Sequence, residues 1–110
     1  MTRLCAVALC MALASLGSND AFAACNAPMA PSKVPDGSSA TKAEMLAAMT
    51  TLKRYDGDVS AYVKCLEFEM KRDRISSLER ERLHNAAIEQ LKAIADRFNG
   101  EVHVYKARHG

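Results

Sequence analysis

Aromatic residues are scarce in this chain of 110 residues, which has no tryptophan and only three tyrosines and three phenylalanines. An excess of one charge sign is also missing: the net charge is +2, whereas a nucleic-acid-binding domain favours a strong basic excess. With so few aromatic side chains the chain can build only a thin core, and domains this small often need a covalent tie. The composition therefore predicts one small domain, a need for extra stabilisation and no nucleic-acid partner.

A hydrophobic run long enough to cross a membrane is absent as well. The uncharged apolar run Leu4–Leu16 has about 13 residues, and a membrane span needs about 20. It follows the basic Arg3 and precedes residues 21–23, which have the A-x-A pattern of a cleavage site. These features predict a secretory signal peptide over residues 1–23, with cleavage one residue later as the second choice and a buried N-terminal helix as the alternative. We therefore expect the mature protein in the periplasm or secreted.

Removal of the signal peptide would leave only two of the four cysteines, Cys25 and Cys65. An even pair in an exported protein predicts a disulfide, and this one would close a loop of about 40 residues. The alternative is a lipoprotein, because the sequence Phe22-Ala23-Ala24-Cys25 resembles a lipobox in which Cys25 carries a lipid. Membrane association is expected only in that case, and Cys65 would then be an odd thiol.

Residues 24–40 contain all three prolines, which excludes a helix and predicts an extended arm. A turn is expected near its end, because Pro35 presets φ, Asp36 can bond back to the backbone and Gly37 accepts a positive φ. If Cys25 is not tethered, the alternative is a disordered linker.

The first predicted helix spans residues 42–73. It begins at a capping box made by Thr41 and Glu44, and its apolar residues recur at the 4-3 spacing typical of helices packed as in a coiled coil. Asp56 interrupts this row and Gly57 could break the helix, but the row resumes in phase, so we favour one helix. Arg80, Arg82 or Lys92 of the second helix could reach Asp56. The apolar row consists of Met45, Met49, Leu52, Val59, Val63, Leu66 and Met70.

The second predicted helix spans residues 77–107 and begins at a second capping box, Ser76 to Glu79. Asn99-Gly100 reads as a helix end, and residues 102–105 could instead form a short edge strand. Continuation with a weak point at residues 99–100 is favoured, because the apolar stripe continues beyond it. Residues 41–110 are thus predicted to form an all-α antiparallel two-helix hairpin, with the extended arm tied to the first helix by the disulfide. The stripe consists of Leu83, Ala87, Leu91, Ile94, Phe98, Val102 and Tyr105.

Chain lengths then decide the path of the arm. Its 16 residues reach roughly 50 Å at most, while Thr41 to Cys65 is about 36 Å of helix. The arm can close the disulfide only by turning near Gly37 and returning along the first helix. Tyr62 and Phe68 lie three residues either side of Cys65, and Tyr55 lies one heptad before Tyr62. We therefore predict that Tyr55, Tyr62 and Phe68 pack against the arm.

Residue patterns that would indicate chemistry are missing. His84, His103 and His109 show no metal-ligand spacing, and Asp56-Gly57-Asp58 lacks the remaining ligands of a calcium loop. No nucleophile elbow, P-loop or dinucleotide fingerprint occurs in the chain. The sequence therefore predicts no catalytic, cofactor-binding or metal site, and no enzyme.

Several short motifs make the chain resemble small uncharacterised exported (periplasmic) helical proteins of Gram-negative bacteria, which have an N-terminal Cys-Pro-rich arm and a Y-x-x-C-L-E helix. The resemblance spans nearly all of residues 25–110. It implies a periplasmic helical hairpin with a tethered N-terminus, and it implies no catalytic residues. The motifs are Cys25-Asn26-Ala27-Pro28, Val34-Pro35-Asp36-Gly37, Tyr62 with Cys65-Leu66-Glu67, Asp96-Arg97-Phe98-Asn99 and Lys106-Ala107-Arg108.

A hairpin of two helices leaves its apolar edges partly open, so we expect a protein partner or a homodimer. The methionines Met45, Met49 and Met70 could form an adaptable binding groove, although ordinary core is the favoured interpretation. The predicted function is a periplasmic binding or interaction module. The alternative is a structural or stress-related component of the cell envelope, lipid-anchored at Cys25.

Overall fold

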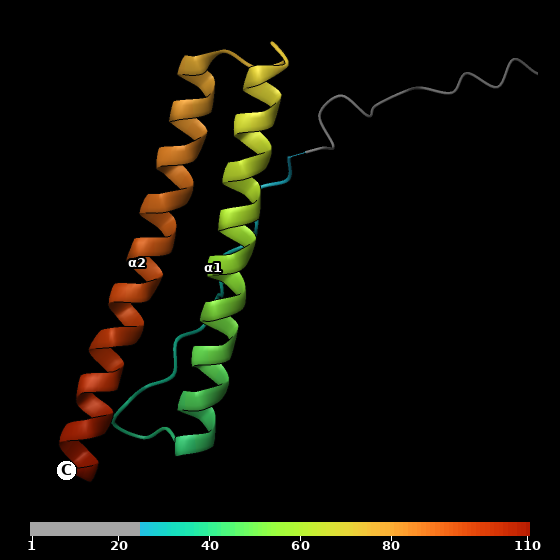
Figure 1. Cartoon of the computed structure of the whole chain (residues 1–110). Coiled ribbons are helices and arrows are strands. Elements are labelled where there is room, and N and C mark those ends of the chain that lie inside the picture. The colour runs from blue at the N-terminus through green and yellow to red at the C-terminus, as the bar shows by residue number, and fades with distance from the viewer. Residues whose placement is uncertain (1–24) are drawn as a thin grey trace, which may run out of the picture.

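The computed structural model describes residues 25–110, so the predicted signal peptide over residues 1–23 lies outside the described part. Two long helices follow the extended arm: α1 spans Lys42–Lys71 and α2 spans Ser77–His109. They lie side by side and antiparallel, joined by a short connection, and the arm returns along them (Figure 1). No strand occurs between residues 25 and 110. The predicted all-α hairpin is confirmed.

Helix α1 begins at the predicted capping box. The Thr41 hydroxyl accepts a hydrogen bond from the Glu44 N–H at 3.1 Å, and the Glu44 carboxylate accepts one from the Thr41 N–H at 2.8 Å. The helix then continues without a break through Gly57, which is exposed and whose missing Cβ would face open space. Glycine costs about 1 kcal/mol in a helix interior, and the buried neighbours Tyr55 and Val59 offset that cost by packing against α2.

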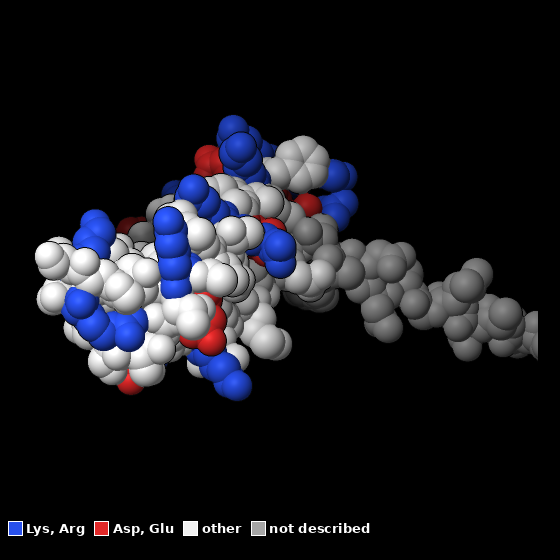
Figure 2. All heavy atoms as spheres, turned by 90° about the horizontal axis from the view of Figure 1, so that it is seen from below, with Lys and Arg blue, Asp and Glu red and all other residues white. Residues whose placement is uncertain are grey.

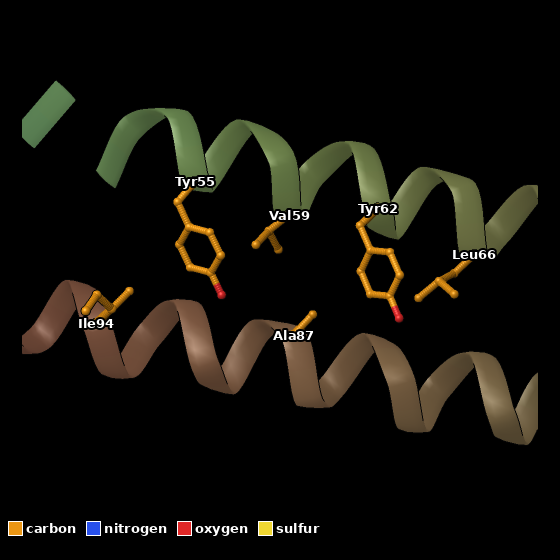
Figure 3. Close-up of a cluster of buried hydrophobic side chains, with 6 residues drawn as sticks. All are labelled: Tyr55, Val59, Tyr62, Leu66, Ala87 and Ile94. Carbon is orange, nitrogen blue, oxygen red and sulfur yellow. The ribbon is translucent and has the colours of Figure 1, made fainter. Parts of the chain in front are cut away.

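The core lies between the two helices. In Figure 3, Tyr55, Val59, Tyr62 and Leu66 point from α1 toward Ala87 and Ile94 of α2. Beside the start of α1, a second cluster joins Ala40 and Met45 to Phe98.

The predicted apolar row of α1 is correct in part: Leu52 and Val63 pack against the core cluster while partly exposed, and Met49 is exposed. One row, from Met45 through Val59 to Leu66, is buried as expected. The neighbouring inward row contains Tyr55 and Tyr62, whereas the predicted row through Asp56 leaves that aspartate exposed. Residues three and four positions apart lie on neighbouring rows of a helix surface. The 4-3 spacing alone therefore does not decide whether the row of Asp56 or the row of the tyrosines faces α2. The arm decides between them, because it covers the side on which the tyrosines lie.

Helix α1 ends at Lys71, two residues before its predicted end at 73, in a Schellman motif. The Arg74 N–H donates to the Glu69 carbonyl oxygen at 2.9 Å, and the Asp73 N–H donates to the Met70 carbonyl oxygen at 3.0 Å. Asp73 adopts φ 56°, the left-handed conformation that this motif requires. Glycine is usual at that position, and an aspartate there has a Cβ penalty.

Replacing Asp73 with glycine should therefore stabilise the protein by about 1 kcal/mol, because it removes the left-handed penalty and a negative charge at a helix C-terminus. Urea unfolding followed by circular dichroism would measure the gain. Asp73→Asn is the matched control, since it removes only the charge and keeps the side-chain shape. A midpoint for Asp73→Gly no higher than that of Asp73→Asn would contradict the role assigned to φ.

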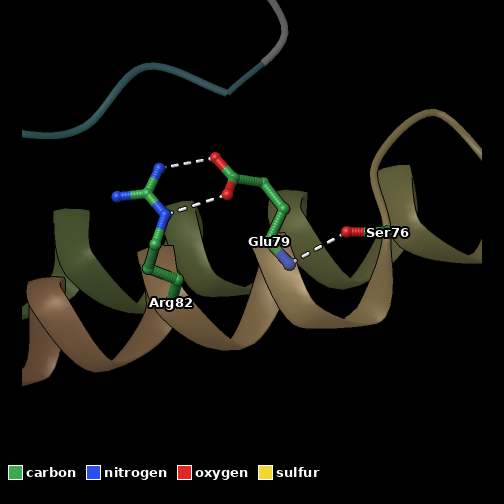
Figure 4. A network of polar contacts seen from close by, with 3 residues as sticks. All are labelled: Ser76, Glu79 and Arg82. Atoms are coloured by element: carbon green, nitrogen blue, oxygen red, sulfur yellow. Dashed lines mark hydrogen bonds and ion pairs between the residues drawn. The ribbon is translucent and has the colours of Figure 1, made fainter.

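A short connection joins α1 to α2, and only half of the predicted capping box of α2 forms. The Ser76 hydroxyl accepts a hydrogen bond from the Glu79 N–H at 3.0 Å. The Glu79 carboxylate instead accepts two hydrogen bonds from Arg82, at 2.6 and 2.9 Å (Figure 4). A bidentate guanidinium is a stronger partner for a carboxylate than a backbone N–H, which explains the difference. These bonds lower the pKa of Glu79 and raise that of Arg82.

Helix α2 continues past Gly100 to His109, so neither a helix end at Asn99-Gly100 nor a strand at residues 102–105 is present. Gly100 is exposed and lies in open space. The last turns are covered by the end of the arm: the Gly37 N–H donates to the Glu101 carboxylate at 2.7 Å, and Arg108 donates to the Ala40 carbonyl oxygen at 2.6 Å. This tertiary packing outweighs the local stop signal.

Candidate interaction surface

The arm is tied to α1 by the Cys25–Cys65 disulfide, whose Cα atoms lie 5.6 Å apart. The predicted pairing is confirmed. From this bond the arm runs back toward the start of α1, as chain length required (Figure 1). Ala30 and Val34 pack against the core cluster, so the arm closes one side of the helix pair.

Two of the three predicted arm-packing residues lie where the arm passes. Tyr55 and Tyr62 are buried, and together with Pro28 they line a small hollow between the arm and both helices. The Tyr55 hydroxyl lies 3.3 Å from the side-chain oxygen of Gln90, to which it donates a hydrogen bond. Burial raises the pKa of Tyr55. Tyr55 and Tyr62 therefore contact both α2 and the arm.

Phe68 is placed differently from the prediction. Its side chain is 55% exposed, and the guanidinium of Arg72 lies 5.2 Å from its ring centroid. The described arm meets α1 at Cys65 and runs toward the start of the helix, away from Phe68. Sequence spacing correctly put Phe68 on the face of Cys65, but it could not give the direction in which the arm leaves the disulfide.

The end of the arm is fixed by a second contact at the far end of the helix pair. Gly37 is buried against α2, where an added Cβ would overlap the Glu101 carbonyl oxygen and lie 2.9 Å from the Tyr105 backbone nitrogen. Gly37 does not have a positive φ, so the reason first expected for a glycine here is wrong. Glycine is needed because two backbones approach closely.

The turn before this contact is held by Asp36. Its carboxylate accepts hydrogen bonds from the Ser38 hydroxyl at 2.6 Å and from the Ser38 N–H at 2.9 Å. These bonds, with a smaller contribution from the charge of Arg108, lower the pKa of Asp36. The predicted bond from Asp36 back to the backbone is therefore present.

The other side of the helix pair has no covering segment within residues 25–110, and we call it the open face. On α1 the position of the open face follows from helical spacing. Thr51, Asp58 and Cys65 border the arm, and the residues two positions before each of them are rotated by about 200° around the helix axis, away from the arm. Its apolar members remain partly exposed, including Met49 at 37% and Ile88 at 40%. The open face comprises Met49, Asp56, Val63 and Met70 of α1 with Ile88, Leu91, Ala95 and Val102 of α2.

Asp56 is the acidic residue at the middle of the open face, and it forms no ion pair with another described residue. The basic residues expected to reach it are engaged elsewhere or stay apart. Arg80 pairs with Glu67 of α1 at 3.6 Å, and Arg82 pairs with Glu79 on its own helix. Lys92 is exposed and forms no ion pair within residues 25–110. The expected contact is missing because Asp56 points to solvent instead of into the seam.

The described residues hold no group of three or more His, Cys, Asp or Glu side chains that could bind a metal ion. His84 lies beside Asn85, and His109 stacks on Tyr105 with ring centroids 4.2 Å apart. Seen from the end where the chain terminates, basic side chains stand apart around the edge with acidic ones between some of them (Figure 2).

Neither α1 nor α2 is long and apolar enough to cross a membrane. No family model, no curated protein and no solved structure matches this chain.

Proposed function

We propose that this protein is an exported binding module that acts by docking another protein surface on its open face. The observation that carries the proposal is the difference between the two sides of the helix pair. A covalently tied arm covers one side, while the other keeps a row of partly exposed apolar side chains along both helices. Met49, Val63 and Met70 form the row on α1, and Ile88 and Leu91 lie opposite on α2.

Contiguous exposed apolar surface is typical of an interaction site, whereas single exposed apolar residues need no explanation. On the open face Met49 and Ile88 are exposed, and Val63, Met70, Leu91 and Val102 are partly exposed along the same side of the helix pair. The methionines at two of these positions have flexible, polarisable side chains that adapt to a partner. A binding role accounts for this face better than a purely structural one.

The disulfide supports the exported location, because such bonds persist in oxidising compartments. It also supports a form without a lipid anchor at Cys25. A lipid would occupy the same sulfur atom that bonds to Cys65, so one chain cannot carry both. The alternative, an envelope component anchored at Cys25, therefore requires loss of the tie that holds the arm.

Site-specific photo-crosslinking in the producing cell would test the binding role. A photoreactive amino acid at position 63 or 88 should give discrete crosslinked species, because both positions lie on the open face. Val104 is the matched control, since it is apolar and 43% exposed but lies 16 residues after Ile88, nearly half a turn around α2. Equal crosslinking at 88 and 104, or none at 63 and 88, would contradict the proposal.

A further inference from the structure

We propose that the surface docked on the open face is a second copy of this chain. The inference rests on the proposed function and names its partner. Two hairpins would pack open face to open face, with α1 of each beside α2 of the other, as an antiparallel four-helix bundle. The arms would lie outside, on the two sides that they already cover.

The size of the open face suits a stable dimer. Helices of 30 and 33 residues are about 45 to 50 Å long, and two packed helices are about 20 Å across. The residues that define the open face span about 32 Å of α1, so the face offers roughly 600 Å² to a partner, and the smallest specific protein interfaces bury about 600 Å² on each side. A second helical hairpin has the same length and width, so it would cover the face from end to end.

Charge complementarity favours a second copy and also selects its orientation. Asp56 lies 15 residues before Lys71, the last residue of α1, and Lys92 lies 15 residues after Ser77, the first residue of α2. The two opposite charges are therefore at the same distance from the hairpin tip. Asp56 lies within the open face of α1, and Lys92 lies one turn after Ile88, at the edge of the open face of α2. Glu67, four residues before Lys71, pairs with Arg80, three residues after Ser77, at 3.6 Å, so residues at nearly equal distances from the tip are level across the helix pair.

Two symmetric arrangements are available to a pair of stacked hairpins. A two-fold axis parallel to the helices places α1 beside the partner's α2 at the same level, which brings each Asp56 to the partner's Lys92. An axis across the helices places the middle of α1 on the middle of the partner's α1, which brings the two Asp56 carboxylates together. Opposite charges attract and like charges repel across an interface, so the first arrangement is the one inferred.

The oligomeric state of the mature chain, with its disulfide intact, is the first measurement. Analytical ultracentrifugation should show a dimer, and Ile88→Asp should raise its dissociation constant about a hundredfold, since a symmetric dimer contains each substitution twice. Val104→Asp, at a similar exposure away from the face, should leave the constant unchanged. A monomer at every concentration, or a dimer whose dissociation constant is unchanged by Ile88→Asp, would overturn the inference.

Mixing two charge variants tests the orientation. Asp56→Lys alone places two positive charges opposite each other at each contact, and Lys92→Asp alone places two negative charges there, so each homodimer should dissociate more readily. A mixture of the two variants restores both opposite-charge contacts between different chains. Native mass spectrometry should then find heterodimers well above the one-half expected from random mixing, and a random distribution would refute the orientation.

The oligomeric state and the crosslinking result together separate this inference from the proposed function. If the chain is monomeric while positions 63 and 88 still crosslink to a different protein, the open face is a binding site and the second copy is the wrong occupant. If the chain is monomeric and neither position crosslinks to another protein, both proposals fail.

Discussion

Replacing Cys65 with serine should lower the free energy of unfolding by about 4 kcal/mol, because the disulfide closes a loop with a sequence separation of 40 residues. A domain of this size loses roughly 4 to 8 °C of melting temperature per kcal/mol, so the midpoint should fall by about 15 to 30 °C. Thermal unfolding of the oxidised mature chain and of Cys65→Ser, followed by circular dichroism at 222 nm, would measure the shift.

The loss should be concentrated in the arm. Without the bond, Ala30 and Val34 must hold the arm against the core by apolar contact alone, while its far end keeps the hydrogen bonds at Gly37 and Ala40. The first half of the arm should then detach from the helix pair more often than the second half. Trypsin cleavage after the exposed Lys33 should accelerate in Cys65→Ser, before the helices unfold.

Cys25→Ser is the matched control, since it breaks the same bond from the other side. The two single variants and the double variant Cys25→Ser/Cys65→Ser should unfold at the same temperature, and the double variant excludes bonds between chains through a leftover thiol. A midpoint for Cys65→Ser within a few degrees of the parent would contradict the stabilising role. A normal midpoint for Cys25→Ser alone would show that Cys65 acts without the bond.

The hairpin could be predicted from sequence because its signals are local. Capping residues set the start of each helix, so both first residues, Lys42 and Ser77, match the prediction. The end of α1 differs from the prediction by two residues, because the helix ends where Asp73 adopts a left-handed conformation that its residue type does not favour. The disulfide followed from a count of two cysteines, a signal that needs no geometry.

The candidate surface was harder to predict because it depends on a segment distant in sequence. The 4-3 spacing of α1 defined a broad apolar stripe, but it could not tell which edge of the stripe would be covered. The interruption at Asp56 is the one available signal of the open edge, but the 4-3 spacing places this polar residue within the seam. Tyr55, the residue before it, fills the seam instead.

Gly37→Ala is expected to destabilise the protein by about 3 kcal/mol, although the change adds a single methyl group. The added Cβ would overlap the Glu101 carbonyl oxygen, and neither backbone can yield easily because Glu101 lies within a helix. The end of the arm would have to move away from α2 and lose the hydrogen bonds at Gly37 and Ala40. Urea unfolding would measure the loss.

Gly57→Ala and Gly100→Ala are the controls, because they make the same substitution at exposed helical positions where a Cβ meets open space. Alanine is favoured over glycine in a helix, so each control should gain about 1 kcal/mol, opposite in sign to Gly37→Ala. The damage from Gly37→Ala should also be local. Tyr105 loses the contact of its backbone with the arm, so hydrogen exchange should quicken over residues 101–109 while the centre of α2 stays protected. Uniformly faster exchange would instead indicate that the arm contact stabilises the whole hairpin.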